Sequence, residues 1–324
     1  MKYAFDNVNL IDGTQDMRVQ PGLCVLTDGE TITDIVPAGT APAGYTRIDL
    51  HGRYLLPGLI NMHVHLAGNG KIQKKQRDLE TLVRRILSNP VSRAVAYRMV
   101  CSFARTELLG GVTTIRTVGG LDTFDTRLRD EIRAGRRIGP RVLAANEGIS
   151  VPGGHMAGSV AIAARTVDEA LAQVDAVHAQ GADLVKLMIT GGVMDATERG
   201  MPGEVKMPAE MMRAVLGNDT SCQWVAQYDF WRELCYFHEY AGASNACTLY
   251  CATGQSARMA GLGDVTGTLR PGLCADMLVT GENPLADLRA LRALDMVVAR
   301  GRIIDRPRPK RNARLDAGLD TLLA

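Results

Sequence analysis

The sequence lacks the paired cysteines that a disulfide framework would need. Its seven cysteines are an odd number, and none of them forms a Cys-x-x-Cys pair. Reduced thiols in a cytosolic protein fit this distribution better than disulfides do. Long apolar runs are missing too, since no window reaches the ~18 residues of a membrane span and the start, MKYAFDNVNLIDG, has no apolar signal-peptide core. We therefore expect a cytoplasmic protein without a membrane partner.

An excess of charge of one sign is also lacking. The 37 basic and 35 acidic residues are scattered along the chain and leave a net charge of +2. No basic face is available for nucleic acid, and no GxGxxG or GxxxxGK[ST] motif is present to bind nucleotide phosphates. The locally basic segment RPRPKRNAR (306–314) has no apolar periodicity. We expect this segment to be a solvated terminus and residues 311–324 to form a tail.

Two local patterns divide the chain. Short runs separated by turns at both ends predict strands, and we expect residues 1–56 and 263–310 to form one small β domain together. Over 57–262, strand-length apolar runs alternate with amphipathic segments, which predicts a parallel sheet with helices outside it, either a (β/α) barrel or a doubly wound sheet. The expected strands are 58–65, 111–119, 140–148 and 182–192, and the expected helices lie near 91–109, 123–136, 166–180, 207–215 and throughout 227–261.

Two histidines stand at the end of the first of these strands, in the stretch LLPGLINMHVHL (55–66). Side chains alternate between the two faces of a strand, so His63 and His65 point the same way. Catalytic groups of a parallel barrel lie at the carboxyl ends of its strands. Two imidazoles that converge there predict a metal site.

Three further residues are candidates for the same site. Lys186 lies within the apolar run DLVKLMIT, where an amine must be paired, neutralised or modified, for example by carbamylation, unless it reaches solvent from an outer face. Asp219 in LGNDTSC could ligate a metal, or it could belong to a turn after a helix that Gly217 caps. His155, in the glycine-flanked loop PGGHMAG, could face a substrate or contact backbone.

These motifs together resemble the amidohydrolase superfamily, in that family's order: PGLINMHVH, VKLMITGG, GNDTSC, YDFWREL and GTLRPGLCADMLVTGENPL. Within the superfamily, VPGGHMAG and VKLMITGGVMD are similar to imidazolonepropionase-related hydrolases and metal-dependent Xaa-Pro or Xaa-Arg dipeptidases. The resemblance covers residue 3 to about residue 305. It implies a TIM-like barrel that holds one or two divalent ions, usually zinc, beside a β-sandwich made from both termini.

The resemblance also implies a role for each candidate. His63 and His65 would ligate the more buried ion, Lys186 would be a carbamylated bridge between two ions, and Asp219 would be a ligand that shuttles a proton. Metal-activated hydroxide would then attack the carbonyl of a small amide or dipeptide-like substrate, and Asp219 would protonate the leaving nitrogen.

One part of the family's pattern is missing. The family carries two more metal histidines on strands five and six, but no histidine lies between His178 and His238. Only 33 residues separate Lys186 from Asp219, about the length of one βα unit. We therefore expect an incomplete barrel of about five strands, truncated near 213–217. Its open strand edges predict a homo-oligomer.

Three interpretations remain open at this point. The chain is an active metal-dependent amidohydrolase that cleaves a C–N bond, or it is a catalytically inactive or internally deleted remnant of one. In the third, the printed sequence omits a segment that the molecule contains. Neither the substrate nor the metal follows from the sequence, because sites built from histidine and carboxylate accept several divalent ions.

Overall fold

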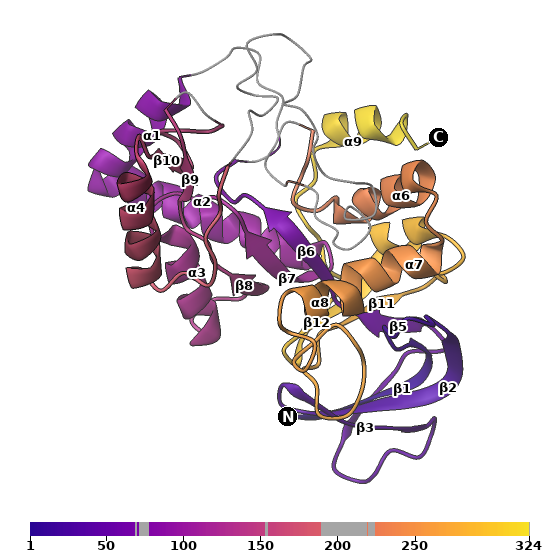
Figure 1. Cartoon of the computed structure of the whole chain (residues 1–324). Coiled ribbons are helices and arrows are strands. Elements are labelled where there is room, and N and C mark those ends of the chain that lie inside the picture. The colour runs from indigo at the N-terminus through magenta and orange to yellow at the C-terminus, as the bar shows by residue number, and fades with distance from the viewer. Residues whose placement is uncertain (69, 71–77, 153–154, 189–218, 220–223, 324) are drawn as a thin grey trace.

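The computed structural model describes residues 1–68, 70, 78–152, 155–188, 219 and 224–323 (Figure 1). The helix expected at 207–215 and the truncation expected near 213–217 lie outside the described residues. The described part is a mixed α/β structure with three separate sheets. Among these residues, no helix combines the length and apolar character that crossing a membrane requires.

Strands from both ends of the chain form one eight-stranded sheet, at the lower right of Figure 1. The two ends meet where Leu56 pairs with Leu278 in an antiparallel ladder. Phe5, Val25 and Leu55 share a buried cluster with residues of the C-terminal strands, so apolar burial joins the two ends as well as hydrogen bonds. The strands, in sheet order, are β13 (Arg302–Asp305), β12 (Leu294–Ala299), β11 (Met277–Thr280), β5 (Tyr54–Pro57), β1 (Lys2–Ile11), β2 (Val19–Asp28) and β3 (Thr31–Pro37), and β4 (Thr46–Asp49) pairs with β1.

A three-stranded parallel sheet lies at the centre of the molecule (Figure 1). It consists of β6 (Leu59–Val64), β7 (Val112–Thr117) and β8 (Arg141–Leu143). The expected helices at 91–109, 123–136 and 166–180 are confirmed as α2 (Pro90–Leu109), α3 (Phe124–Arg133) and α4 (Val167–Ala179). A further helix, α1 (Leu79–Ser88), begins after Asp78, whose side chain caps it by accepting a hydrogen bond from the Thr81 amide.

Two of the expected strands need correction. The strand expected at 140–148 ends at Leu143, because the next two amides donate to side chains, Ala144 to Asp183 and Ala145 to Thr117. A short pair follows it, β9 (Gly148–Ser150) with β10 (Ala161–Ala163). Of the strand expected at 182–192, residues 182–188 are described, and they contain only an isolated parallel bridge between Leu187 and Ile149.

The helical region expected at 227–261 is broken into short pieces. These are α6 (Phe230–Ala241), α7 (Asn245–Tyr250), the π-helical turn η1 (Cys251–Gln255) and α8 (Ser256–Met259). Gly242 ends α6 with a φ of +66°, and the Ser244 side chain caps α7 by accepting from the Cys247 amide. A 3-10 helix, η2 (Leu288–Arg292), packs against α6.

The end of the chain is not a solvated tail. Residues 313–320 form α9 (Ala313–Asp320), which lies beside α6 in Figure 1. Asn312 caps its start, and Leu315 and Leu319, one helical turn apart, are buried. The helix was not expected because its apolar repeat is short and directly follows a basic segment without apolar periodicity.

Candidate metal centre

His63 and His65 lie at the carboxyl end of β6. Their rings have centroids 5.5 Å apart and planes inclined at 57°. Val64, between them in sequence, is fully buried in the main hydrophobic core. The alternation of the strand therefore directs both imidazoles to one side and the apolar side chain to the other.

Asp219 approaches this pair from a distant part of the chain. Its Oδ1 lies 3.3 Å from Nε2 of His63 and 3.2 Å from Nε2 of His65. Its φ of +52° is the left-handed conformation that Asp adopts in turns, so a turn residue and a metal ligand are compatible at this position. The three ligand atoms lie within 4.8 Å of one another. The structure thus brings together three of the four residues that the resemblance implies as ligands.

The donor set fits a divalent ion. Bonds of about 2.0–2.1 Å to a tetrahedral zinc ion place two ligand atoms roughly 3.3 Å apart, which matches the measured separations from Asp219. Two imidazoles and one carboxylate are also a common donor set of catalytic zinc sites, in which water or substrate takes the fourth position. This arrangement can hold one ion.

A backbone carbonyl fixes the orientation of His65. The Nδ1 atom of His65 lies 2.8 Å from the carbonyl oxygen of Gly119, which can only accept a hydrogen bond. Nδ1 therefore carries the proton, and the lone pair of Nε2 faces Asp219. Gly119 has a φ of +133°, and a Cβ at this position would lie 3.2 Å from Cε1 of the His65 ring. Glycine allows the backbone to approach the ring this closely.

The electrostatic surroundings keep His63 neutral. Burial lowers the pKa of His63 to about 4, an effect that the Asp219 carboxylate opposes and that nearby Lys186 strengthens. A neutral imidazole at pH 7 can donate a lone pair to a metal but cannot form an ion pair with Asp219. A neutral His63 at 3.3 Å from Asp219 is in the form that can ligate a metal.

Lys186 lies close enough to the centre to affect the pKa of His63, and Asp219 affects the pKa of Lys186 in turn. Burial lowers the pKa of Lys186, Asp219 raises it, and the Arg116 guanidinium lowers it further. The backbone of Lys186 is held by β9, because its carbonyl accepts a hydrogen bond from the Ile149 amide at 2.8 Å. The position is compatible with a second-ion ligand, and carbamylation remains a prediction.

His155 lies in the turn between β9 and β10 and is half-buried. It is not among the residues whose ligand atoms converge in the described part of the chain. Its expected contact with substrate remains a prediction.

Several residues at the centre were not expected from the sequence. Arg116 lies on β7, and its Nε donates a hydrogen bond to the Met62 carbonyl at 2.8 Å. A charged residue within a segment that was expected to be a strand is the same signal that marked Lys186, so it could have been found. Asp125 is fully buried, and burial raises its pKa to about 6 while Thr117 and His65 lower it. The carbonyl of Gly119 has no signal in the sequence, since every residue carries one.

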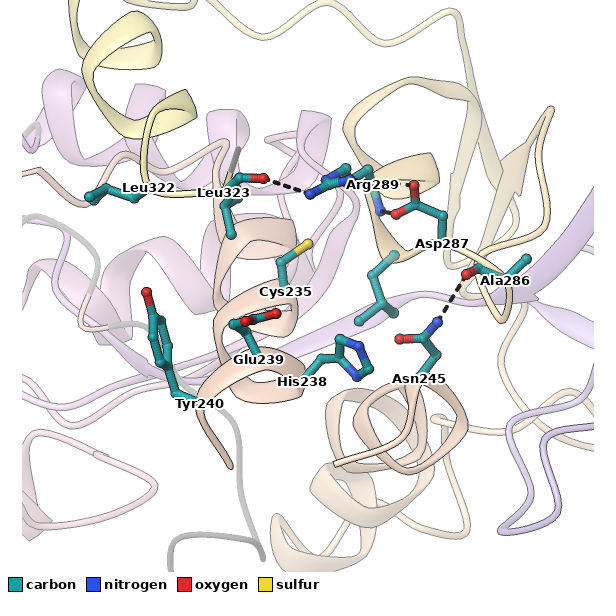
Figure 2. Close-up of a pocket in the computed structure, with 11 residues that line it drawn as sticks. Cys235, His238, Glu239, Tyr240, Asn245, Ala286, Asp287, Arg289, Leu322 and Leu323 are labelled. Carbon is teal, nitrogen blue, oxygen red and sulfur yellow. Dashed lines mark hydrogen bonds and ion pairs between the residues drawn. The ribbon is translucent and has the colours of Figure 1, made fainter. Parts of the chain in front are cut away.

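A cavity of about 410 Å³ lies elsewhere, between α6, η2 and the end of the chain (Figure 2). Its lining includes Cys235, His238 and Asn245 but none of the three converging ligands. His238 is already engaged there, with Nδ1 2.6 Å from the Ala243 carbonyl. Arg289 donates to the Leu323 carbonyl at 2.6 Å across one edge. These contacts join structural elements of the chain.

Comparison with known proteins identifies the family of the chain. Residues 54–222 match the amidohydrolase family, and the chain belongs to this family. The family generally depends on divalent metals, and its fold is a TIM-like barrel. The motifs in the sequence thus identified the family correctly. No curated protein matches the sequence.

Solved structures supply the more particular likenesses. A Bifidobacterium longum protein assigned as a prolidase is 26% identical, with a TM-score of 0.81 and coverage of 100% of this chain and 99% of that one. A Xaa-Pro dipeptidase with methionine bound in its active site is 20% identical, with a TM-score of 0.75 and coverage of 94% and 100%. Ochratoxinase of A. niger is 17% identical, with a TM-score of 0.74 and coverage of 94% and 96%. The last two show likeness of fold alone.

Proposed function

We propose that this chain is a metal-dependent hydrolase that cleaves the C–N bond of a small amide or dipeptide-like substrate. The observation that carries the proposal is the convergence of His63 Nε2 and His65 Nε2 on Oδ1 of Asp219, at 3.3 and 3.2 Å. Membership of the amidohydrolase family and the likeness to a protein assigned as a prolidase support the same chemistry.

The residues of the centre would have separate roles in metal binding and proton transfer. His63 and His65 would hold a divalent ion, zinc being the first candidate, and the Gly119 carbonyl keeps His65 in the tautomer that this requires. When bound, the ion would lower the pKa of a water molecule and polarise a substrate carbonyl. Asp219 would accept the proton of the attacking water and deliver it to the leaving nitrogen.

Two residues have proposed roles around this core. Lys186, which shares electrostatic effects with His63 and Asp219, would be carbamylated and bridge to a second ion. His155 would contact the substrate from the turn after β9.

The expected composite β domain, incomplete barrel, cytoplasmic location and homo-oligomer likewise remain predictions. An intact mass of 34.9 kDa would exclude an omitted segment, and the native mass would give the oligomeric state.

A catalytically inactive remnant is the second candidate. The observation in its favour is the lack of any histidine between His178 and His238, where the family carries two further ligands. A site with only two histidines, one lysine and one aspartate would hold a second ion weakly.

Hydrolysis assays separate the two candidates. Zinc-loaded protein is incubated with libraries of Xaa-Pro dipeptides, Xaa-Arg dipeptides and N-acyl amino acids. We expect release of amino acid that stops after dialysis against a chelator and returns with zinc. His63→Ala should abolish it, whereas His178→Ala, on α4, should not. Protein that binds zinc but hydrolyses none of these libraries would favour the remnant.

A further inference from the structure

We propose that Gln227 is a positioning residue that holds together the two segments that follow the metal ligands in sequence, an inference that rests on the proposed function. One segment, residues 66–68 with Gly70, comes after His65, and the other, residues 224–229, comes after Asp219. The Nε2 of Gln227 donates a hydrogen bond to the Gly68 carbonyl at 2.8 Å. This bond ties together segments that are far apart in the sequence.

A second hydrogen bond joins the same two segments. The Trp224 amide donates to the Gly70 carbonyl at 2.9 Å. Gly70 has a φ of +68°, and a Cβ there would lie 2.4 Å from the Val225 carbonyl oxygen. Only glycine permits the two backbones to come this close. The segments are therefore in direct contact, and Gln227 supplies the side-chain link.

The link matters because, among the described strands, β6 lies at the edge of its sheet. Among the described residues, β6 pairs with β7 and with no other strand. The position of Asp219 relative to the two histidines thus depends on contacts other than a strand ladder. Gln227 is 4% exposed, so its amide cannot exchange the Gly68 carbonyl for water without cost. A shift of the two segments would separate Asp219 from the imidazoles.

The C-terminal helix supports the Gln227 segment from its other side. Ala226 and Tyr228, which flank Gln227, share a buried cluster with Leu315 and Leu319 of α9. The Tyr228 hydroxyl also accepts a hydrogen bond from the Asn312 amide at 2.8 Å, at the start of that helix. The segment is thus packed between α9 and the loop after His65, and Gln227 faces the loop.

The test measures zinc affinity in full-length protein by competition with a chelator of known affinity. Gln227→Met keeps the length of the side chain and removes the donor. We expect it to raise the Kd for zinc about tenfold or more, the usual effect of losing a residue that orients ligands. The control is Asn9→Leu, which removes a comparable bond from Asn9 Nδ2 to the Gly52 carbonyl, at 2.5 Å, in the terminal sheet.

The outcomes separate positioning from general stability. Asn9→Leu should lower the melting temperature of metal-free protein at least as much as Gln227→Met and leave the Kd for zinc unchanged. An unchanged Kd in Gln227→Met, or an equal rise in both variants, would overturn the proposal. The readout is zinc affinity and does not depend on hydrolysis. If Gln227→Met weakens zinc binding but the wild-type protein cleaves no substrate, the role of Gln227 stands and the proposed activity is refuted.

Discussion

Replacing Gly119 with alanine should weaken metal binding as well as the fold. A non-glycine residue held at a φ near +133° costs about 1–3 kcal/mol in stability. The added Cβ would also lie 3.2 Å from Cε1 of His65 and 3.2 Å from Cε of Met188. The Met188 methyl can rotate away, but the His65 ring is bonded to the carbonyl of Gly119 itself. Relief of the contact therefore moves Nε2, and we expect zinc affinity to fall about 10–100-fold.

Two assays and a matched variant isolate this effect. Zinc affinity is measured by chelator competition, and the stability of metal-free protein by urea unfolding. The control is Gly135→Ala: Gly135 has a φ of +70°, and a Cβ there would meet nothing within 4 Å. It should lose about 1 kcal/mol of stability through backbone strain and keep its zinc affinity. Equal zinc affinities in the two variants would refute the argument about His65.

Three other predictions follow from the structure. Asp219→Asn should reduce hydrolysis at saturating zinc by about 100-fold or more, since an amide cannot accept the proton of water; retained turnover would contradict its role. Burial raises the pKa of Glu131, but hydrogen bonds from Arg137, Tyr97 and Arg127 outweigh this and lower it to about 2 from 4.5. Glu131→Gln should therefore destabilise the protein above about pH 4.5, with the difference vanishing as pH falls through about 2, as urea unfolding across pH would show. Leu319→Ala should cost about 2–4 kcal/mol, because Leu319 is 7% exposed against the Gln227 segment, and a loss below 1 kcal/mol would contradict its packing.

The sequence predicted the centre where local periodicity was enough. Alternation along β6 placed His63 and His65 on one face, and the structure agrees. The strand-helix order correctly predicted α2, α3 and α4. Both predictions depend only on neighbours in sequence, which is why they needed no knowledge of the tertiary structure.

Tertiary contacts decided what the sequence left open. Asp219 is a turn residue by its local pattern, and only folding brings its Oδ1 to the histidines. Lys186 was expected within a strand, but residues 182–188 make only an isolated bridge to β9. The helix α9 was not predicted, because the sequence before it is basic and its apolar repeat consists of only two leucines one turn apart. Gln227 carries no sequence signal at all, because a glutamine becomes informative only when its partner is known.

Metal stoichiometry is the most direct test of the central claim. Purified wild-type protein and the His63→Ala/His65→Ala double variant are loaded with zinc, freed of excess metal, and measured by inductively coupled plasma mass spectrometry. A centre formed by His63, His65 and Asp219 predicts at least one zinc per wild-type chain and loss of that zinc in the double variant. Wild-type protein with less than one zinc per chain, or a double variant that keeps its zinc, would contradict the assignment.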